Sequence, residues 1–214
     1  MIDIGRGMGK QVAALITDMS QPLGRTVGNS LEVIECIETL KGRGPKDLES
    51  LSIELAAWML SLAGVDSVEQ ARSRVRTAIT NGSGLRKLQQ LIERQGGDPR
   101  VCDEPGLLPR ARDTVVLKAT HDARVGSIAC RSIGHAAMLL GAGRETLESA
   151  IDPAVGIMLH KKCGELVIAG EPLLTIHFNE PRRLDLALPL LERAIRLAPE
   201  APPSTPLIRD VLHS

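Results

Sequence analysis

Residues 11–40 read QVAALITDMSQPLGRTVGNSLEVIECIETL, and this stretch decides the fold that we expect. The apolar run at 11–17, which a turn-like segment at 18–24 follows, is typical of a buried strand in a parallel sheet. Asn29 is a good N-cap for the next helix, and Glu32 completes a capping box. Parallel strands need neighbours joined by crossover helices. Ten residues cannot supply them. Either the strand pairs with later strands or with another polypeptide, or the sheet is incomplete, and we expect an incomplete sheet.

Three more helices are expected downstream. One begins at Gly44-Pro45, and another begins at Asp66 or Ser67. Helical spacing resumes at Leu85 and stops at residues 96–99, which read GGDP. The helix after Pro45 carries one apolar stripe, formed by Leu48, Leu51, Leu55, Trp58, Met59 and Leu62.

The pattern changes after a polar linker at 98–112. Apolar runs predict strands at 114–118, 124–129, 155–160 and 173–178, with helices at 133–140 and 184–197. Proline-rich residues 198–206 are not expected to be ordered. Between the last two of these strands, glycines alternate with single apolar residues, which favours a tightly turned half of a β-barrel. The residues of this pattern are Lys162, Gly164, Val167, Gly170, Leu173 and Ile176.

Composition excludes several classes of function. The 26 basic and 26 acidic residues give a net charge of zero, so no electrostatic field favours nucleic acid or an anionic membrane. One Trp, one Phe and no Tyr leave no platform for stacking bases. No apolar run is long enough to span a membrane. The four cysteines lack CxxC spacing, which indicates reduced thiols rather than disulfides or zinc. We expect a soluble, cytoplasmic protein.

Motifs that could carry chemistry are weak. Residues 5–10 (GRGMGK) have the wrong glycine spacing for a phosphate loop, and a turn between a helix and a strand fits them better. Gly141 suits the end of a helix. The five histidines show no metal or triad spacing. Irregular-loop carbonyls before Glu35 could hold a hard monovalent cation, although a solvated helix carboxylate is the simpler interpretation.

Three stretches carry a specific resemblance. ITDMSQPLGRTVGNSLEVIECIETLKGRGP (16–45), QGGDPRVCDEPGLLP (95–109) and IGHAAMLLGAGRETLESAIDPAVGIMLHKKCGELVIAGEPLLTIHFNE (133–180) resemble thymidine and pyrimidine-nucleoside phosphorylases. The match runs in order up to about residue 180, and it covers only the C-terminal half of that family.

The resemblance implies a mixed α+β chain. Residues 1–110 correspond to the residual edge of an α/β domain, mostly helical. Residues 111–181 correspond to the family's C-terminal α+β domain, with a barrel-sandwich or lipoyl-like part. Residues 182–214 form a last helix and a proline-rich tail. No lysine lies in the context of a carrier's modified hairpin, so a swinging-arm role is not expected.

The implied activity is reversible phosphorolysis of pyrimidine nucleosides to a free base and pentose 1-phosphate, with phosphate as co-substrate. The family's phosphate-binding and pyrimidine-binding segments have no counterpart here, so no catalytic, phosphate-binding or substrate-binding residue is carried over. What the resemblance carries over is part of a potassium site: the backbone carbonyls of Leu23 and Thr26 and the side chain of Glu35.

Two hypotheses follow. The chain is the C-terminal half of a pyrimidine-nucleoside phosphorylase, inactive without an N-terminal half, or it is a non-catalytic interaction module derived from that family. An unfinished sheet should leave an apolar face exposed. We therefore expect a complementing N-terminal half or self-association, and no nucleic-acid or membrane partner.

Overall fold

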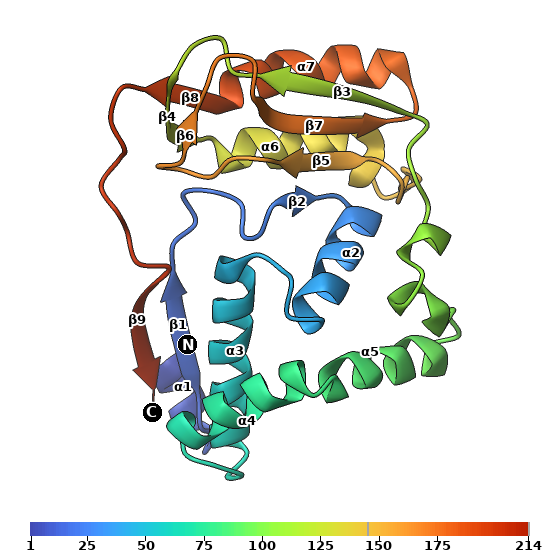
Figure 1. Cartoon of the computed structure of the whole chain (residues 1–214). Coiled ribbons are helices and arrows are strands. Elements are labelled where there is room, and N and C mark those ends of the chain that lie inside the picture. The colour runs from blue at the N-terminus through green and yellow to red at the C-terminus, as the bar shows by residue number, and fades with distance from the viewer. Residues whose placement is uncertain (145, 214) are drawn as a thin grey trace. The chain divides into compact units, whose positions relative to one another are not determined.

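The computed structural model describes residues 1–144 and 146–213 (Figure 1). Helices and strands are both present, which confirms the mixed α+β expectation at that level. The chain groups into two compact units. Unit 1 comprises Met1–Asp18, Ile37–Pro99 and the described residues from Thr205 onward, and unit 2 comprises Met19–Cys36 and Arg100–Ser204.

Unit 1 is mainly helical. Its elements include α1 (Ile2–Gly7), α3 (Lys46–Leu62), α4 (Val68–Thr80) and α5 (Ser83–Arg94). Ser67 and Gln70 form a reciprocal capping box at the start of α4. The three helices expected after residue 44 are thus confirmed. The glycines of residues 5–10 lie in α1 and the turn that follows it, as expected.

The strand expected at 11–17 is confirmed as β1 (Ala13–Thr17), but its expected parallel pairing is wrong. β1 pairs antiparallel with β9 (Ile208–His213), with Leu15 opposite Val211. Antiparallel pairing needs no crossover helix, so the end of the chain can supply the partner. Among the described residues, β1 and β9 form a sheet of two strands.

The start of α2 (Asn29–Leu40) differs in detail from the predicted capping box. The Glu32 carboxylate accepts from the backbone N–H of Gly28 at 2.9 Å, not from that of Asn29. The Asn29 amide instead donates to the carbonyl of Ala142 at 2.9 Å. Gly28 has φ +145°, and a Cβ there would lie 2.6 Å from the Val155 carbonyl oxygen. The helix starts one residue earlier than the pattern predicted, so the backbone N–H that donates to Glu32 is that of Gly28.

Unit 2 contains two antiparallel sheets (Figure 1). The larger sheet has the order β2-β5-β7-β3, and the smaller has the order β6-β4-β8. The bounds of these strands are β2 (Thr26–Val27), β3 (Asp113–Lys118), β4 (Ala123–Ile128), β5 (Gly156–Leu159), β6 (Leu166–Val167), β7 (Pro172–Phe178) and β8 (Ile195–Ala198). The four runs expected as strands in this region are confirmed as β3, β4, β5 and β7. Gly164 and Gly170, both at φ +85°, make the turns on either side of β6.

Helices α6 (Cys130–Ala137) and α7 (Pro181–Ala194) pack against each other in unit 2. The helix expected at 133–140 is present, and Gly141 (φ +110°) lies where its extension ends. The expected last helix ends three residues early, because 195–198 form β8 beside β4. One continuous apolar core joins both helices to both sheets; its fully buried members include Val125, Ile133, Ile157, Leu159, Val167, Leu174 and Ile176.

Residues 199–206 contain no helix or strand. The strand β9 that follows them was not expected from the sequence. Over the part of the chain that the structure describes, no helix has the length and apolar character needed to cross a bilayer.

Candidate functional site

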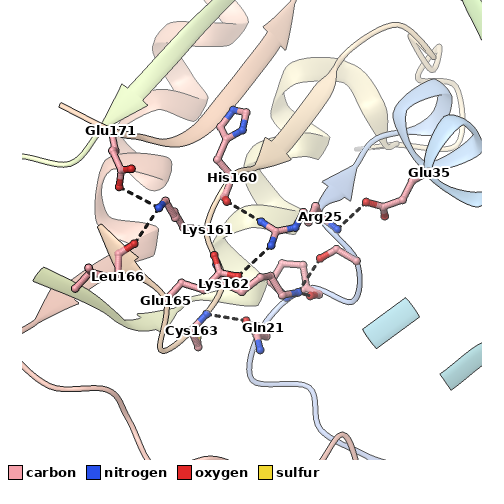
Figure 2. Close-up of polar contacts among 12 residues, drawn as sticks. Gln21, Arg25, Glu35, His160, Lys161, Lys162, Cys163, Glu165, Leu166 and Glu171 are labelled. Carbon is pink, nitrogen blue, oxygen red and sulfur yellow. Dashed lines mark hydrogen bonds and ion pairs between the residues drawn. The ribbon is translucent and has the colours of Figure 1, made fainter. Parts of the chain in front are cut away.

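The candidate site lies in unit 2, where the loop at residues 20–25 meets the turn at residues 160–165 between β5 and β6 (Figure 2). The 20–25 loop contains the turn Pro22-Leu23-Gly24 and leads into β2 and then α2. The Arg25 carbonyl accepts from the Leu159 N–H at 2.6 Å, which extends the β2–β5 pairing by one residue. The loop is therefore anchored to the sheet at its C-terminal end.

Glu35 fixes the inner side of the 20–25 loop. Its Oε1 accepts from the Arg25 backbone N–H at 2.8 Å, and its Oε2 accepts from the Thr26 hydroxyl at 3.0 Å. Gly24 has φ +68°, and a Cβ there would lie 2.2 Å from Glu35 Oε2. Only glycine fits both the backbone conformation and the closeness of the carboxylate.

The Arg25 guanidinium connects the loop to the 160–165 turn. Its Nη1 donates to the carbonyl of His160 at 2.6 Å, and its Nη2 donates to Glu165 Oε1 at 3.0 Å (Figure 2). Both side chains of the Arg25–Glu165 ion pair are more than a third exposed, so solvent screens it. Burial, and then the charge of Arg25, lower the pKa of His160.

Lys162 reaches the same loop from the turn. Its ammonium donates to the backbone carbonyl of Pro22 and, at 2.7 Å, to that of Gly24. One residue on, the Cys163 backbone N–H donates to Gln21 Oε1 at 3.0 Å. Hydrogen bonds between residues 138 to 142 positions apart in the sequence therefore hold Gln21, Pro22 and Gly24 of the loop.

The sequence-predicted cation ligands are close in the chain and partly close in space. Glu35 contacts Thr26 through the hydroxyl rather than through the backbone carbonyl that was predicted as a ligand, and Leu23 lies in the turn just before Thr26. Two backbone carbonyls and a carboxylate are the oxygen donors that hard cations prefer. The lack of a Cβ at Gly24 lets the loop backbone approach the Glu35 carboxylate, whose two oxygens accept hydrogen bonds from Arg25 and Thr26. Among residues 1–144 and 146–213, no group of three or more His, Cys, Asp or Glu forms a metal cluster.

Sequence reasoning missed Arg25, Lys162 and Glu165. Lys162 was the first residue of the glycine pattern that predicted a tightly turned β-structure. No local signal indicates that its ammonium reaches a loop 138 residues away. The other histidine of interest, His177, has a buried Nε2 with no hydrogen-bond partner within the described structure. Burial, and then His160, lower its pKa.

Comparison with known protein families identifies a domain in the second half of the chain. Residues 124–198 match the family described as the pyrimidine nucleoside phosphorylase C-terminal domain. The matched segment runs from β4 to β8 and includes the 160–165 turn.

Similarity to whole proteins extends over nearly all of the chain. It is 44% identical to the pyrimidine-nucleoside phosphorylase of Staphylococcus haemolyticus over 213 residues, which are 99% of this chain and 49% of that protein. The corresponding enzyme of Bacillus subtilis is 45% identical over 94% of this chain and 46% of its own length. The chain belongs to the pyrimidine-nucleoside phosphorylase family, as the counterpart of its C-terminal part. It spans about half the length of these curated relatives.

Proposed function

We propose that this chain is the C-terminal half of a pyrimidine-nucleoside phosphorylase, which acts when an N-terminal half completes it. The observation that carries the proposal is a sequence identity of 44–45% to proteins with that name. The identity extends over almost the whole of this chain and over about half the length of each relative. The reaction is the reversible attack of phosphate on the anomeric carbon of a pyrimidine nucleoside, which releases the base and pentose 1-phosphate. Thymidine and uridine are candidate substrates, and a cytoplasmic location is part of the proposal.

The need for a second half is argued from unit 1. In the part of the chain that the structure describes, β1 has a strand on one edge only. Large apolar side chains of unit 1 are exposed to solvent, among them Ile4, Ile16, Leu55 and Met59. Such surface is unfavourable in water and is expected to be covered by a partner. We assign this role to an N-terminal half, with self-association as the outcome in its absence.

We also propose that potassium binds at the 20–25 loop. The carbonyls of Leu23 and Thr26 and the carboxylate of Glu35 would hold it, together with ligands from the N-terminal half. A bound cation supplies positive charge that keeps the loop oxygens together. The chain's own part is to orient the Glu35 carboxylate, which the Arg25 N–H and the Thr26 hydroxyl hold. In the same proposal, the two sheets of unit 2 form the family's barrel-sandwich part.

The test is complementation. The chain is co-expressed with the N-terminal half of the Bacillus subtilis relative, and the purified complex is assayed with thymidine, uridine, phosphate and potassium by ultraviolet absorbance. We expect turnover from the complex and none from either half alone. A stable one-to-one complex without turnover would contradict the proposal. Within an active complex, Glu35→Ala should weaken the potassium dependence, whereas Glu38→Ala, on the same helix and paired with Arg43, should not.

The alternative is a non-catalytic interaction module. The exposed apolar side chains of unit 1 favour it as much as they favour an enzyme half, because any partner could cover them. A module should melt at the same temperature with or without phosphate, nucleoside and potassium. A rise in Tm that depends on one of these ligands would argue against it, because only ligands that bind the native state stabilise it.

A further inference from the structure

Lys162 stands out because its ammonium contacts two backbone carbonyls of one loop rather than solvent alone. We propose that Lys162 is a tethered cation for the 20–25 loop: its ammonium occupies a site formed by the Pro22 and Gly24 carbonyls that would otherwise take a free monovalent cation. The proposal concerns the stability of unit 2 and does not depend on phosphorolysis.

The geometry of the carbonyls supports this proposal. The oxygens of Pro22 and Gly24 both lie within hydrogen-bond distance of a single nitrogen atom, so they converge on one point. Convergent carbonyl dipoles repel one another unless a positive charge lies between them, which is how proteins bind hard cations. A lysine ammonium is a compact charge with three donors and can take the place of such an ion. Hydrogen bonds to a charged group are also stronger than those between neutral groups.

The surroundings of Lys162 hold the ammonium at this point. In the turn, the N–H of the next residue, Cys163, donates to the Gln21 side chain of the loop. In the loop, the Arg25 side chain donates to the carbonyl of His160 in the turn (Figure 2). The loop and the turn thus exchange hydrogen bonds in both directions. Because the stem of Lys162 starts from a turn held in this way, little additional ordering is needed to place its charge.

The Lys162 site differs from the proposed potassium site. Lys162 contacts the carbonyls of Pro22 and Gly24, whereas the proposed potassium ligands are the carbonyls of Leu23 and Thr26 with Glu35. Lys162 therefore fixes the backbone on both sides of Leu23 without replacing any of the potassium ligands. In this chain the ammonium acts as a positioning group for the loop.

Lys161 provides a matched control, because it is the adjacent residue and has the same side chain. Its ammonium donates to the Leu166 carbonyl at 2.9 Å and pairs with Glu171 at 3.0 Å, away from the 20–25 loop (Figure 2). Removing it deletes an equal charge and an equal length of side chain from the same turn. It should leave the loop carbonyls unchanged.

The experiment compares the full-length chain with its Lys162→Ala, Lys162→Met, Lys162→Arg and Lys161→Ala variants. Hydrogen–deuterium exchange with mass spectrometry follows peptides covering residues 19–27, and calorimetry gives the Tm. Lys162→Ala and Lys162→Met should increase exchange in 19–27 about tenfold and lower the Tm by roughly 3–8 °C. Lys162→Arg, which keeps the charge, should retain more protection than Lys162→Met. Lys161→Ala should not change exchange in this segment.

Chemical rescue separates a cation site from simple packing. Lys162→Ala leaves space for the three carbons and the nitrogen that it removes, so n-propylammonium should restore protection of residues 19–27 in that variant. Tetramethylammonium, which has no N–H donor, and n-propanol, which has no charge, should not restore it at equal concentration and ionic strength. Potassium chloride compared with choline chloride tests whether a free ion can also occupy the vacated site.

Two results would overturn the proposal. One is equal loss of protection in Lys162→Arg and Lys162→Met with no rescue by n-propylammonium, which would indicate a packing role alone. The other is unchanged exchange of residues 19–27 in Lys162→Ala. A Lys162→Ala chain that does not fold would be replaced by Lys162→Met and Lys162→Arg, whose difference carries the same information. Because no activity is measured, the result is independent of whether the family reaction occurs.

Discussion

Unit 1 and unit 2 bury apolar surface to very different extents. In unit 2 the core is continuous, and bulky residues from both sheets such as Val125, Ile157 and Leu174 are completely buried in it. In the described part of unit 1, the buried apolar residues are Ile37, Ile53, Ala57 and Ala71. Burial of apolar area is the main favourable term in folding. Unit 2 therefore gains more stability from apolar burial, while unit 1 relies more on polar contacts.

The largest predicted effect tests this difference with two leucine truncations. Leu174→Ala in β7 removes a side chain with 0% exposure and should cost about 3–5 kcal/mol of unfolding free energy, through lost burial and a residual cavity. Leu55→Ala in α3, where the residue is 45% exposed, should cost less than about 1 kcal/mol. Urea unfolding followed by circular dichroism measures both. Equal losses would contradict the proposed contrast between the units.

Unit 1 compensates in part with a polar network between α3 and α4. The Glu54 carboxylate accepts two hydrogen bonds from the Arg72 guanidinium, at 2.7 and 2.8 Å, and one from the Trp58 indole at 3.0 Å. The Glu54 side chain is only 15% exposed. Glu54→Ala should therefore cost about 1–3 kcal/mol, because it removes the acceptor of the Trp58 indole and of the Nε and Nη2 groups of Arg72. Trp58, the single tryptophan, reports the unfolding of unit 1 by fluorescence.

Glu69 offers the control for this prediction. It also pairs with Arg72, at 3.2 Å, but its side chain is 83% exposed. Glu69→Ala should change the stability of unit 1 by less than about 0.5 kcal/mol, as is usual for exposed ion pairs. If the two substitutions had the same effect, the Glu54 network would be no more than a surface contact.

The two units should also respond to acid in different pH ranges. Burial lowers the pKa of His177 below its ordinary 6.5. The unfolded chain then binds protons first as the pH falls, so the stability of unit 2 is complete above pH 6.5 and decreases below it. In unit 1, hydrogen bonds from Arg72 lower the pKa of Glu54 from 4.5, so that contribution is lost only below about pH 4.5. Between pH 7 and pH 5, unit 2 should weaken and unit 1 should not.

His177→Leu tests this pH dependence. It removes the buried ring nitrogen that has no partner within the described structure, and it should reduce the loss of Tm of unit 2 between pH 7 and pH 5 by roughly 2–4 °C. His121→Leu, at an exposed position, is the control and should leave the pH profile unchanged. Calorimetry at several pH values, with Trp58 fluorescence for unit 1, separates the two responses. Parallel losses in both units would contradict the assignment.

The sequence predicts local structure well and long-range contacts poorly in this chain. The stripe from Leu48 to Leu62 and the helix start at Asp66 or Ser67 are local signals, and the helices they predict are present. The antiparallel pairing of β1 with β9 joins residues almost 200 positions apart, and no local pattern encodes such a pairing. The same holds for the site. Glu35 could be proposed from the resemblance, but the reach of Lys162 to Pro22 and Gly24 depends on the folded sheet.

The smallest predicted effect concerns the end of β9 in unit 1. The rings of Trp58 and His213 lie with their centroids 5.3 Å apart and their planes tilted by 34°, so β9 contacts α3 through an aromatic pair. His213→Ala should cost about 0.5 kcal/mol, at the low end for aromatic pairs because the histidine is exposed, and should change the Trp58 emission. His213→Phe keeps a ring at this position and should preserve most of the stability. If His213→Ala left the Trp58 emission unchanged, β9 would not be docked on α3 in solution, and the contrast in packing between unit 1 and unit 2 would be larger still.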